Sequence, residues 1–317
     1  MDEASIIDTF FRHLGSVRTD VVLGIGDDAA LLRAPSGFEL ALTTDSLVER
    51  VHFLPGSAPR SIGHRALAVN LSDLAAMGAE PAWALLSLTL PEADAQWLGE
   101  FAAGFGRLAR EHEVALVGGN LSRGPLNVTV QLAGFVPAGT ALRRSGGRAG
   151  DEIWISGTLG DASRGRAIAG SAGADPGSQL LRSRFDFPTP RPGLGQALRG
   201  VATACIDLSD GLLADLPRLA DASGCGAVLE LQQLPVSDAL RAVAGEQAWQ
   251  AALVGGEDYE LCFTAPAAQA DAIAALADRC AVRLARCGRL RAASGLELRL
   301  GADVIQFSHS PFGHFGP

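Results

Sequence analysis

The sequence predicts an α+β protein of two α/β domains, an N-terminal mixed-sheet domain and a C-terminal α+β domain. The chain has 317 residues, a length that favours two domains over one. Segments typical of strands and helices follow one another in mixed order, and strands dominate the first half. Residues 137–150 are rich in glycine and arginine and show no apolar period. We therefore expect domains over 1–137 and 151–317, joined by a linker over 138–150.

The N-terminal half contains clear element signals. Apolar residues at helical spacing predict a short helix over 4–14, and strands are expected over 21–25 and 38–44, the second ending at Thr43 and Thr44. Pro59 suits the first turn of a helix that we expect to reach Met77. The remaining elements expected here are strands over 83–90, 114–117 and 126–136 and a helix over 93–112.

The C-terminal half reads as α+β. A strand over 203–206 should feed a helix whose buried face carries Leu212, Leu216 and Leu219. Residues 170–178 look like a mobile loop. The other expected elements are strands over 151–156, 227–231, 259–264, 281–286 and 296–300 and helices from Ser237 and over 266–279.

Composition excludes several classes of protein. Hydrophobic residues make up 48% and charged residues 19% of the chain, as in globular proteins. No apolar run approaches the roughly 20 residues of a membrane span, and the first residues lack the features of a secretion signal. The net charge of −9, without a basic patch, does not favour a nucleic-acid partner. We expect a cytoplasmic protein that binds neither membranes nor nucleic acids.

All 26 basic residues are arginine, because the chain contains no lysine. This excludes a Walker A loop, a protein-kinase fold and Schiff-base chemistry, each of which needs a lysine amine. The five cysteines lack Cys-x-x-Cys spacing and lie mostly among apolar neighbours. We expect them to be buried thiols.

Four segments repeat one pattern, in which an apolar run meets glycine or a hydroxyl residue and then a carboxylate. Any one of these acids could be a cap or turn residue, but their recurrence favours a shared cation site. Asp73 is the sharpest case, because an unpaired carboxylate in an apolar helix costs several kcal/mol to bury. Oxygen ligands of this type suit Mg²⁺. The acids are Asp28, Asp45, Asp73, Asp207 and Asp210.

Two segments could bind anions. Residues 116–125 place glycines straight after a strand, where backbone N–H groups can approach a phosphate. Arg143 and Arg144 could clamp a polyphosphate, although a solvated linker would look the same. His52 is a lone loop histidine, which by itself is more often structural. The aromatic cluster at the C-terminus is either a docked tail or a surface that stacks a flat heterocycle.

Taken together, the motifs resemble those of the thiamine-monophosphate kinases, in the ATP-binding superfamily that includes aminoimidazole ribonucleotide synthetase. The likeness runs in order from about residue 10 to the C-terminus. It is carried by Gly24-Ile-Gly-Asp-Asp-Ala29, Thr43-Thr-Asp-Ser46, Val51-His-Phe53, Val69-Asn-Leu-Ser-Asp-Leu-Ala-Ala-Met-Gly78, Gly118-Gly119, Arg123-Gly-Pro125, Arg144-Ser-Gly146, Ile206-Asp-Leu-Ser-Asp-Gly211 and Gly255-Gly-Glu-Asp-Tyr-Glu-Leu261.

The resemblance implies an aminoimidazole ribonucleotide synthetase-like fold and a defined reaction. The γ-phosphoryl group of ATP would pass to thiamine monophosphate by direct in-line attack, giving thiamine diphosphate and ADP. Several Mg²⁺ ions would offset the repulsion between the two anionic reactants. The resemblance also implies a homodimer formed through the N-terminal domains.

The resemblance assigns site residues by position. Gly119, Asn120, Arg144 and Ser209 would hold ATP, and no side chain would act as a general base because the attacking phosphate oxygen is already ionised. Contacts to thiamine monophosphate would come from His52, Glu257 and Phe312. The metal ligands would be Asp28, Thr43, Thr44, Asp45, Asp73, Asn120, Asp207 and Asp210. The resemblance assigns no role to Asp27.

One position departs from the family pattern. Where the family commonly has Gly-Gly-Asp-Thr, this chain has Gly118-Gly-Asn-Leu121. Asn120 can still coordinate a metal through its amide oxygen but carries no charge. We expect weaker occupancy at that metal position and retained activity.

Two other functions remain open. Selenophosphate synthetases and hydrogenase-maturation enzymes share the superfamily but depend on a cysteine near the N-terminus or at the C-terminal end, whereas the first cysteine here is Cys205 and the last residues are Phe-Gly-Pro. A non-catalytic nucleotide-binding module would not need the acceptor-side residues His52 and Glu257. Turnover of thiamine monophosphate distinguishes these alternatives.

Overall fold

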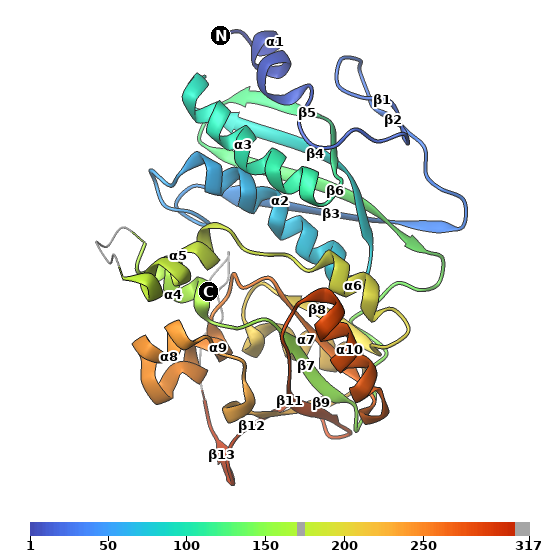
Figure 1. Ribbon diagram of the computed structural model, residues 1–317, viewed down its shortest axis with the longest axis vertical. Coiled ribbons are helices and arrows are strands. Elements are labelled where there is room, and N and C mark those ends of the chain that lie inside the picture. Colours follow the sequence, from blue (N-terminus) through green and yellow to red (C-terminus); the bar gives the residue numbers. More distant parts are fainter. Residues whose placement is uncertain (170–174, 308–317) are drawn as a thin grey trace. The chain divides into compact units, whose positions relative to one another are not determined.

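The computed structural model describes residues 1–169 and 175–307 and divides the chain into two compact units (Figure 1). Unit 1 comprises Met1–Leu74 and Ala79–Thr140, and unit 2 comprises Ala75–Gly78 and the chain from Ala141 onward. Each unit combines a sheet with helices, which confirms the predicted two-domain α+β class. The assignment of 138–150 as a linker between domains 1–137 and 151–317 stays a prediction.

Unit 1 is built on a four-stranded sheet in the order β3-β6-β4-β5. Strands β4 and β5 are parallel, and the other neighbouring pairs are antiparallel, so the sheet is mixed as predicted. Strands β1 and β2 form a separate antiparallel pair. The elements are α1 (Glu3–Ile6), the π-helical turn η1 (Ile7–Phe11), β1 (Val21–Leu23), β2 (Leu31–Leu32), β3 (Phe38–Val48), α2 (Pro59–Ala76), β4 (Glu80–Leu90), α3 (Ala95–Glu111), β5 (Ala115–Arg123) and β6 (Asn127–Pro137).

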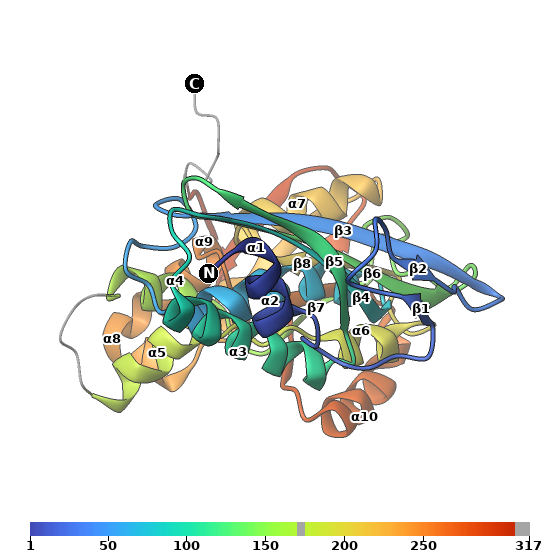
Figure 2. The ribbon, with the colours of Figure 1, turned by 90° about the horizontal axis from the view of Figure 1, so that it is seen from above.

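The two faces of this sheet differ in burial. Along β6, Val128, Val130 and Leu132 are fully buried, whereas Gln131, which points the other way, is exposed. Helices α2 and α3 cover the buried face (Figures 1 and 2). They approach closely at Gly104, where a Cβ atom would lie 1.9 Å from the carbonyl oxygen of Arg60. The opposite face of the sheet is therefore left partly open.

Three predicted elements of unit 1 were wrong in extent. The expected helix over 4–14 begins with one α-helical turn, which passes into the π-helical turn η1. Strand β3 continues past Thr44 to Val48, because it pairs along its full length with β6. Most of the expected phosphate loop over 116–125 is part of β5, which ends at Arg123. A bulge at Val117, between the pairs Ala84↔Leu116 and Leu85↔Gly118, lets the strand continue through the glycines.

Unit 2 contains a seven-stranded sheet in the order β13-β12-β9-β11-β7-β10-β8. Its neighbouring strands are antiparallel except for the parallel pair of β12 and β9. The elements are β7 (Glu152–Ser156), α4 (Asp161–Ala167), α5 (Pro176–Asp186), α6 (Pro192–Leu198), β8 (Ala204–Leu208), α7 (Leu212–Ala222), β9 (Gly226–Glu230), η2 (Leu231–Gln233), α8 (Asp238–Ala244), η3 (Gly245–Gln247), α9 (Ala248–Val254), β10 (Glu260–Ala265), η4 (Ala267–Gln269), α10 (Ala270–Cys280), β11 (Leu284–Arg291), β12 (Leu296–Leu300) and β13 (Asp303–Ile305).

Both faces of the unit 2 sheet are buried, each under its own hydrophobic cluster. Leucines of α7 and α9 pack on one face with Ile206, and leucines of α6 and α10 pack on the other with Phe263. The predicted buried thiols are confirmed: all five cysteines are free, and only Cys280 is partly exposed. Burial raises the pKa of Cys262 to about 12, so this thiol stays protonated near neutral pH.

Two expectations for unit 2 also change. Strand β8 extends to Leu208, so Asp207 lies inside the strand and not after it. Helix α5 begins at Pro176 behind the N-cap Asp175, so the end of the predicted loop over 170–178 is helical. Residues 170–174 of that loop lie outside the described residues. Among the residues that the structure describes, no helix has both the length and the hydrophobicity needed to span a bilayer.

Candidate functional site

A cavity of about 1070 Å³ opens on the less buried face of the unit 1 sheet. Its walls come from α1 and η1, from residues 24–30 and from strands β3 to β6. Four of the residues assigned to a site from sequence line this one cavity. They are Asp28, Thr44, Gly119 and Asn120.

Gly119 occupies a position that only glycine can fill. Its φ of 151° lies in the region that side chains rarely adopt, and a Cβ atom would stand 1.8 Å from the carbonyl oxygen of Leu86 on β4. The backbone of β5 therefore faces the cavity without a side chain at this point. Asn120 follows, exposed and opposite Ser87. This arrangement can present backbone N–H groups and an amide to a phosphate.

The run from Thr43 to Asp45 is divided between two faces of β3. The hydroxyl of Thr43 donates to the Asp73 carboxylate on α2, which places Thr43 on the helix side. Asp45 shares that side because side chains alternate along a strand. Thr44 lines the cavity on the other side, and its hydroxyl donates to the carbonyl of Val130 (3.2 Å).

His52 has a defined ring orientation in the loop after β3. Its Nδ1 accepts the backbone N–H of Val48 at 3.0 Å, so a neutral ring carries its proton on Nε2. The His52 carbonyl accepts the guanidinium of Arg65, a fully buried side chain of α2 (2.9 Å). The backbone therefore fixes one ring nitrogen, and with it the orientation of the whole ring.

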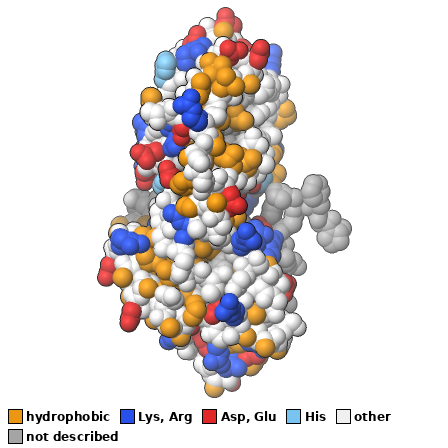
Figure 3. Space-filling model, turned by 90° about the vertical axis from the view of Figure 1, so that its right-hand side faces the viewer, with side chains coloured by type: hydrophobic (Ala, Val, Ile, Leu, Met, Phe, Trp, Pro, Cys, Tyr) orange, Lys and Arg blue, Asp and Glu red, His pale blue; other side chains and the backbone are white. Residues whose placement is uncertain are grey.

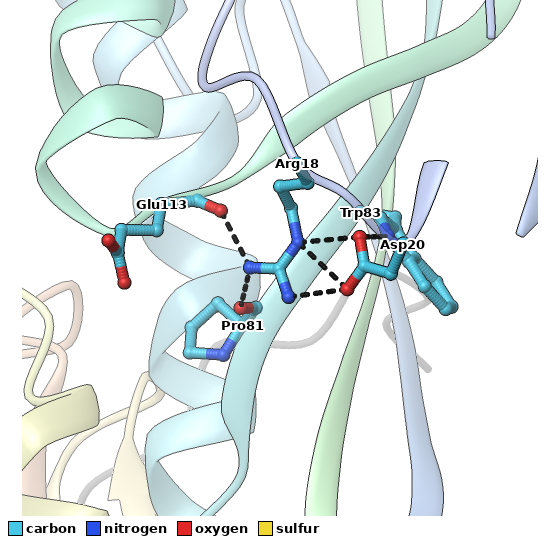
Figure 4. Close-up of polar contacts among 5 residues, drawn as sticks. All are labelled: Arg18, Asp20, Pro81, Trp83 and Glu113. Carbon is cyan, nitrogen blue, oxygen red and sulfur yellow. Dashed lines mark hydrogen bonds and ion pairs between the residues drawn. The ribbon is translucent and has the colours of Figure 1, made fainter. Parts of the chain in front are cut away.

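A polar network fixes Trp83, which lines the cavity. Figure 4 shows the Arg18 guanidinium facing the Asp20 carboxylate (2.7 Å), which also accepts Trp83 Nε1–H (3.0 Å). Arg18 donates further to the carbonyls of Glu113 (2.9 Å) and Pro81 (3.5 Å). Burial acts to raise the pKa of Asp20, but the hydrogen bonds from Arg18 and Trp83 outweigh it and lower that pKa.

In unit 2 the acidic motif forms a tight turn between β8 and α7. Asp207 is 6% exposed within β8, while Ser209 and Asp210 are half-buried in the turn. The carboxylate of Asp215 on α7 accepts the backbone N–H groups of Ser209 (3.0 Å) and Asp210 (2.9 Å). Burial raises the pKa of Asp215 to about 6.

Glu257 lies on a strained loop that is bonded to the same turn. Its N–H donates to the carbonyl of Ser209 (2.8 Å), and the N–H of Tyr259 donates to the carbonyl of Leu208 (2.9 Å). Both Glu257 and Tyr259 have positive φ, 72° and 52°, a conformation that costs a non-glycine residue of order 1–3 kcal/mol. The Tyr259 hydroxyl donates to the Glu257 carboxylate (3.1 Å), which orients it.

A buried ion pair supports this loop from β10. Glu260 is 2% exposed and binds the Arg191 guanidinium with both oxygens (2.5 and 2.7 Å). The Ser156 hydroxyl donates to the same carboxylate (2.6 Å). Both oxygens of Glu260 thus have donors, and one of these donors is a cation, which is what allows a charge to be buried there.

The structure says less about two other predicted residues, Arg144 and Phe312. Arg144 is exposed, and its carbonyl accepts the Ser223 hydroxyl (3.0 Å). Phe312 lies outside the described residues. Throughout residues 1–169 and 175–307, no three His, Cys, Asp or Glu side chains gather closely enough to hold a metal ion between them. The predicted ligand set stays a prediction, divided between the two units.

Comparison with known proteins identifies the family. The model of the AIR synthase related protein N-terminal domain matches residues 26–136, and that of the C-terminal domain matches 148–301. The chain is 44% identical to a thiamine-monophosphate kinase of Salmonella typhimurium over 99% of this chain and 98% of that protein. The chain belongs to the thiamine-monophosphate kinase family. The kinase of Escherichia coli K12 is 51% identical over 83% of this chain and 82% of that protein.

Solved members of the thiamine-monophosphate kinase family share the fold. The crystal structure of the enzyme from Stenotrophomonas maltophilia K279a matches with a TM-score of 0.86 and 46% identity, over 90% of this chain and 93% of that one. AaThiL complexed with AMPPCP and TMP matches with a TM-score of 0.79 and 32% identity, covering 92% of each chain. The hydrogenase maturation protein HypE, at 21% identity and a TM-score of 0.76, shares the fold alone.

Sequence reasoning missed Asp215, Arg218 and Tyr259, which shape the turn after β8 and the adjoining Glu257 loop. For Asp215 a signal was present. It lies on the apolar stripe of α7 between Leu212 and Leu216. An acid on a buried helix face needs a partner that compensates its charge, as was inferred for Asp73. Arg218 follows three residues later, the spacing of an ion pair on a helix.

Proposed function

We propose that the protein transfers the γ-phosphoryl group of ATP to the phosphate of thiamine monophosphate, giving thiamine diphosphate and ADP. The observation that carries this proposal is the likeness to thiamine-monophosphate kinases along nearly the whole chain, which includes the acid-bearing segments of both units. The relative complexed with AMPPCP and TMP supports the same pair of reactants. ATP use also fits the cytoplasmic location expected from the sequence.

The donor groups of the proposed site fit Mg²⁺ chemically. They are carboxylate, hydroxyl and amide oxygens, without the thiolate or imidazole clusters that softer metals prefer. Asp73 with Thr43 in unit 1, and Asp207 with Asp210 in unit 2, would hold the ions, together with Asp28, Thr44, Asp45 and Asn120. Bound Mg²⁺ supplies positive charge that offsets the repulsion between the two phosphates.

The chain's own residues would bind and orient the reactants. The bare backbone at Gly119, with Asn120, would approach the phosphates of ATP, and Arg144 and Ser209 would add donors. His52 would contact the phosphate of thiamine monophosphate. Glu257, held by Tyr259, would contact the same substrate, as would Phe312. No base is needed because the attacking phosphate oxygen is ionised, so the residues act by positioning.

A homodimer through unit 1 is part of the proposal. Large apolar side chains are exposed on β3, including Phe38 (42%), Leu40 (51%) and Leu42 (67%). Figure 3 shows hydrophobic side chains in patches over the upper part of the view, where unit 1 lies. Exposed apolar side chains that gather in patches are typical of an interface. Light scattering should give twice the chain mass, and Leu42→Glu should give the monomer; a wild-type monomer would refute this part.

The test of function is a turnover assay. The purified protein is incubated with ATP, Mg²⁺ and thiamine monophosphate, and thiamine diphosphate and ADP are separated and quantified. We expect both products in equal amounts. Asp210→Asn should reduce their formation, and Asp303→Asn, an exposed acid on β13 at the other edge of the same sheet, should not. Binding of ATP without thiamine diphosphate would instead favour the non-catalytic module.

A further inference from the structure

Asp215 is a buried carboxylate that the proposed reaction does not use. It lies in the first turn of α7 and is 1% exposed. Burying a carboxylate costs several kcal/mol unless hydrogen bonds and an opposite charge compensate it. Both of its oxygens have such partners, and these partners show what the side chain does.

One oxygen of Asp215 holds the turn that precedes the helix. Its Oδ2 accepts the N–H of Ser209 (3.0 Å) and the N–H of Asp210 (2.9 Å). An ordinary acid at a helix N-terminus accepts N–H groups of the helix itself. Here the donors lie five and six residues before Asp215, outside α7, so the carboxylate fixes the turn.

The other oxygen reaches Asp210 through an arginine. Arg218 Nη1 donates to Asp215 Oδ1 (2.7 Å) and to Asp210 Oδ2 (2.9 Å). Arg218 is about half exposed, whereas Asp215 is buried, so the acid is the fixed member of the pair. The Asp210 carboxylate is therefore located by Asp215 twice, through its backbone N–H and through the guanidinium.

The same turn also carries the loop of Glu257. While the N–H groups of Ser209 and Asp210 point to Asp215, the carbonyl of Ser209 accepts the N–H of Glu257 (2.8 Å). The turn is narrow because Gly211 has φ 104°, and a Cβ atom there would lie 2.9 Å from the carbonyl oxygen of Val254. Any shift of the turn moves the Glu257 loop with it.

We propose that Asp215 is a positioning residue, which sets Ser209 and Asp210 for the nucleotide and its metal and, through Ser209, sets Glu257 for the acceptor. This inference rests on the proposed function. It goes further by assigning to one buried side chain the alignment of both substrates. Groups that orient metal ligands from behind typically change metal affinity or activity roughly 10- to 100-fold when removed.

The experiment compares Asp215→Asn with the matched control Asp303→Asn. Binding of Mn²⁺, as a probe for Mg²⁺, is measured by electron paramagnetic resonance without substrates, and kcat and both KM values are measured with them. For Asp215→Asn we expect Mn²⁺ binding and kcat/KM to fall roughly 10- to 100-fold, with KM rising for both ATP and thiamine monophosphate. Asp303→Asn should match wild type.

The readouts separate the two proposals. If wild type makes no thiamine diphosphate, the proposed function fails, yet the Mn²⁺ measurement still tests Asp215. Unchanged Mn²⁺ binding and unchanged KM values in Asp215→Asn would overturn the inference. Should that variant fail to fold, Arg218→Met keeps both backbone bonds of Asp215 and removes only the link to Asp210. It should weaken Mn²⁺ binding while circular dichroism and the melting curve remain cooperative; wild-type binding in Arg218→Met would also overturn the inference.

Discussion

The two acidic turns of the molecule are built differently, although their sequences follow one pattern. In unit 1, Asp27 and Asp28 are exposed, and Asp27 accepts the N–H of its own neighbour (2.8 Å). The nearby carbonyl of Ile25 is held from the surface by Arg12 (2.8 Å). In unit 2 the turn at Ser209 is held from below by a buried carboxylate. Unit 2 thus presents its acids on a turn held by a buried carboxylate, whereas unit 1 presents them on an exposed segment.

The difference follows from what lies behind each turn. Residues 24–30 line a cavity. The turn after β8 is packed between α7 and the Glu257 loop, and the buried Asp215 carboxylate accepts a hydrogen bond from its backbone. Preorganisation therefore depends on the neighbouring elements more than on the motif. Substitutions, ordered from the largest expected effect to the smallest, test this contrast.

The largest expected effect is on the buried ion pair of unit 2. Glu260→Gln leaves the Arg191 charge buried and unpaired, which should lower the unfolding free energy by about 3–5 kcal/mol. Asp8→Asn in unit 1 breaks an Arg–Asp pair whose Asp8 side chain is 59% exposed, and should cost less than about 1 kcal/mol. Denaturant melts of both variants check this. Equal losses would remove the contrast between buried and surface support.

The next effect concerns the close backbone contact at Gly119 in the wall of the unit 1 cavity. Gly119→Ala forces a Cβ atom against the Leu86 carbonyl, so the strands must shift, and we expect a loss of about 1–3 kcal/mol in unfolding free energy. Gly193→Ala is the matched control, because a Cβ atom added at Gly193 would meet no neighbouring atom within 4 Å. Thermal melts compare the two variants. A Gly119→Ala protein as stable as its control would refute the close contact.

A smaller, pH-dependent effect should appear at Asp20. The pKa of Asp20 is lower in the folded protein than the ordinary value of 3.8. The contribution of Asp20 to the unfolding free energy is therefore complete above pH 3.8 and is lost as the pH falls through the folded pKa. At neutral pH, Asp20→Asn should cost about 1–2 kcal/mol, since it removes charge-assisted hydrogen bonds. Urea melts between about pH 7 and pH 2 should show wild type and variant converging. A constant difference across this range would contradict the assignment.

The mildest expected effect is at Asn120. Asn120→Asp restores the family carboxylate, and because the side chain is exposed the added charge should change metal binding by only about 1 kcal/mol, or roughly fivefold. The Mg²⁺ concentration for half-maximal turnover should fall. If the Mg²⁺ requirement is unchanged, Asn120 has no role at a metal.

The sequence predicted the fold because its strongest signals are local. Helix α2 runs from Pro59 to Ala76, within one residue of the expected end, and β12 has the expected limits of 296–300. These elements are specified by their own periodicity. The two-unit α+β class follows from the order of such elements, and the family follows from motifs read in order.

The errors concern partners that are distant in sequence. Strand β3 reaches Val48 because Val48 pairs with Asn127, which no local pattern contains. The pairing of Arg191 with Glu260 spans 69 residues. Sequence supplied the residue types of the candidate site. The position of Asp45 on the same side of β3 as Thr43 depends on a strand whose length the sequence understated.

Strand β3 has a practical consequence for anyone who handles the protein. In the described part of the chain it borders the sheet with β6 as its single neighbour, and over 11 residues it contains neither lysine nor proline to discourage further pairing. Uncovered edges of this kind template aggregation. Under the proposed homodimer, purified material should therefore keep best at concentrations that maintain the dimer, and should be lost to precipitate and vessel walls on extended dilution.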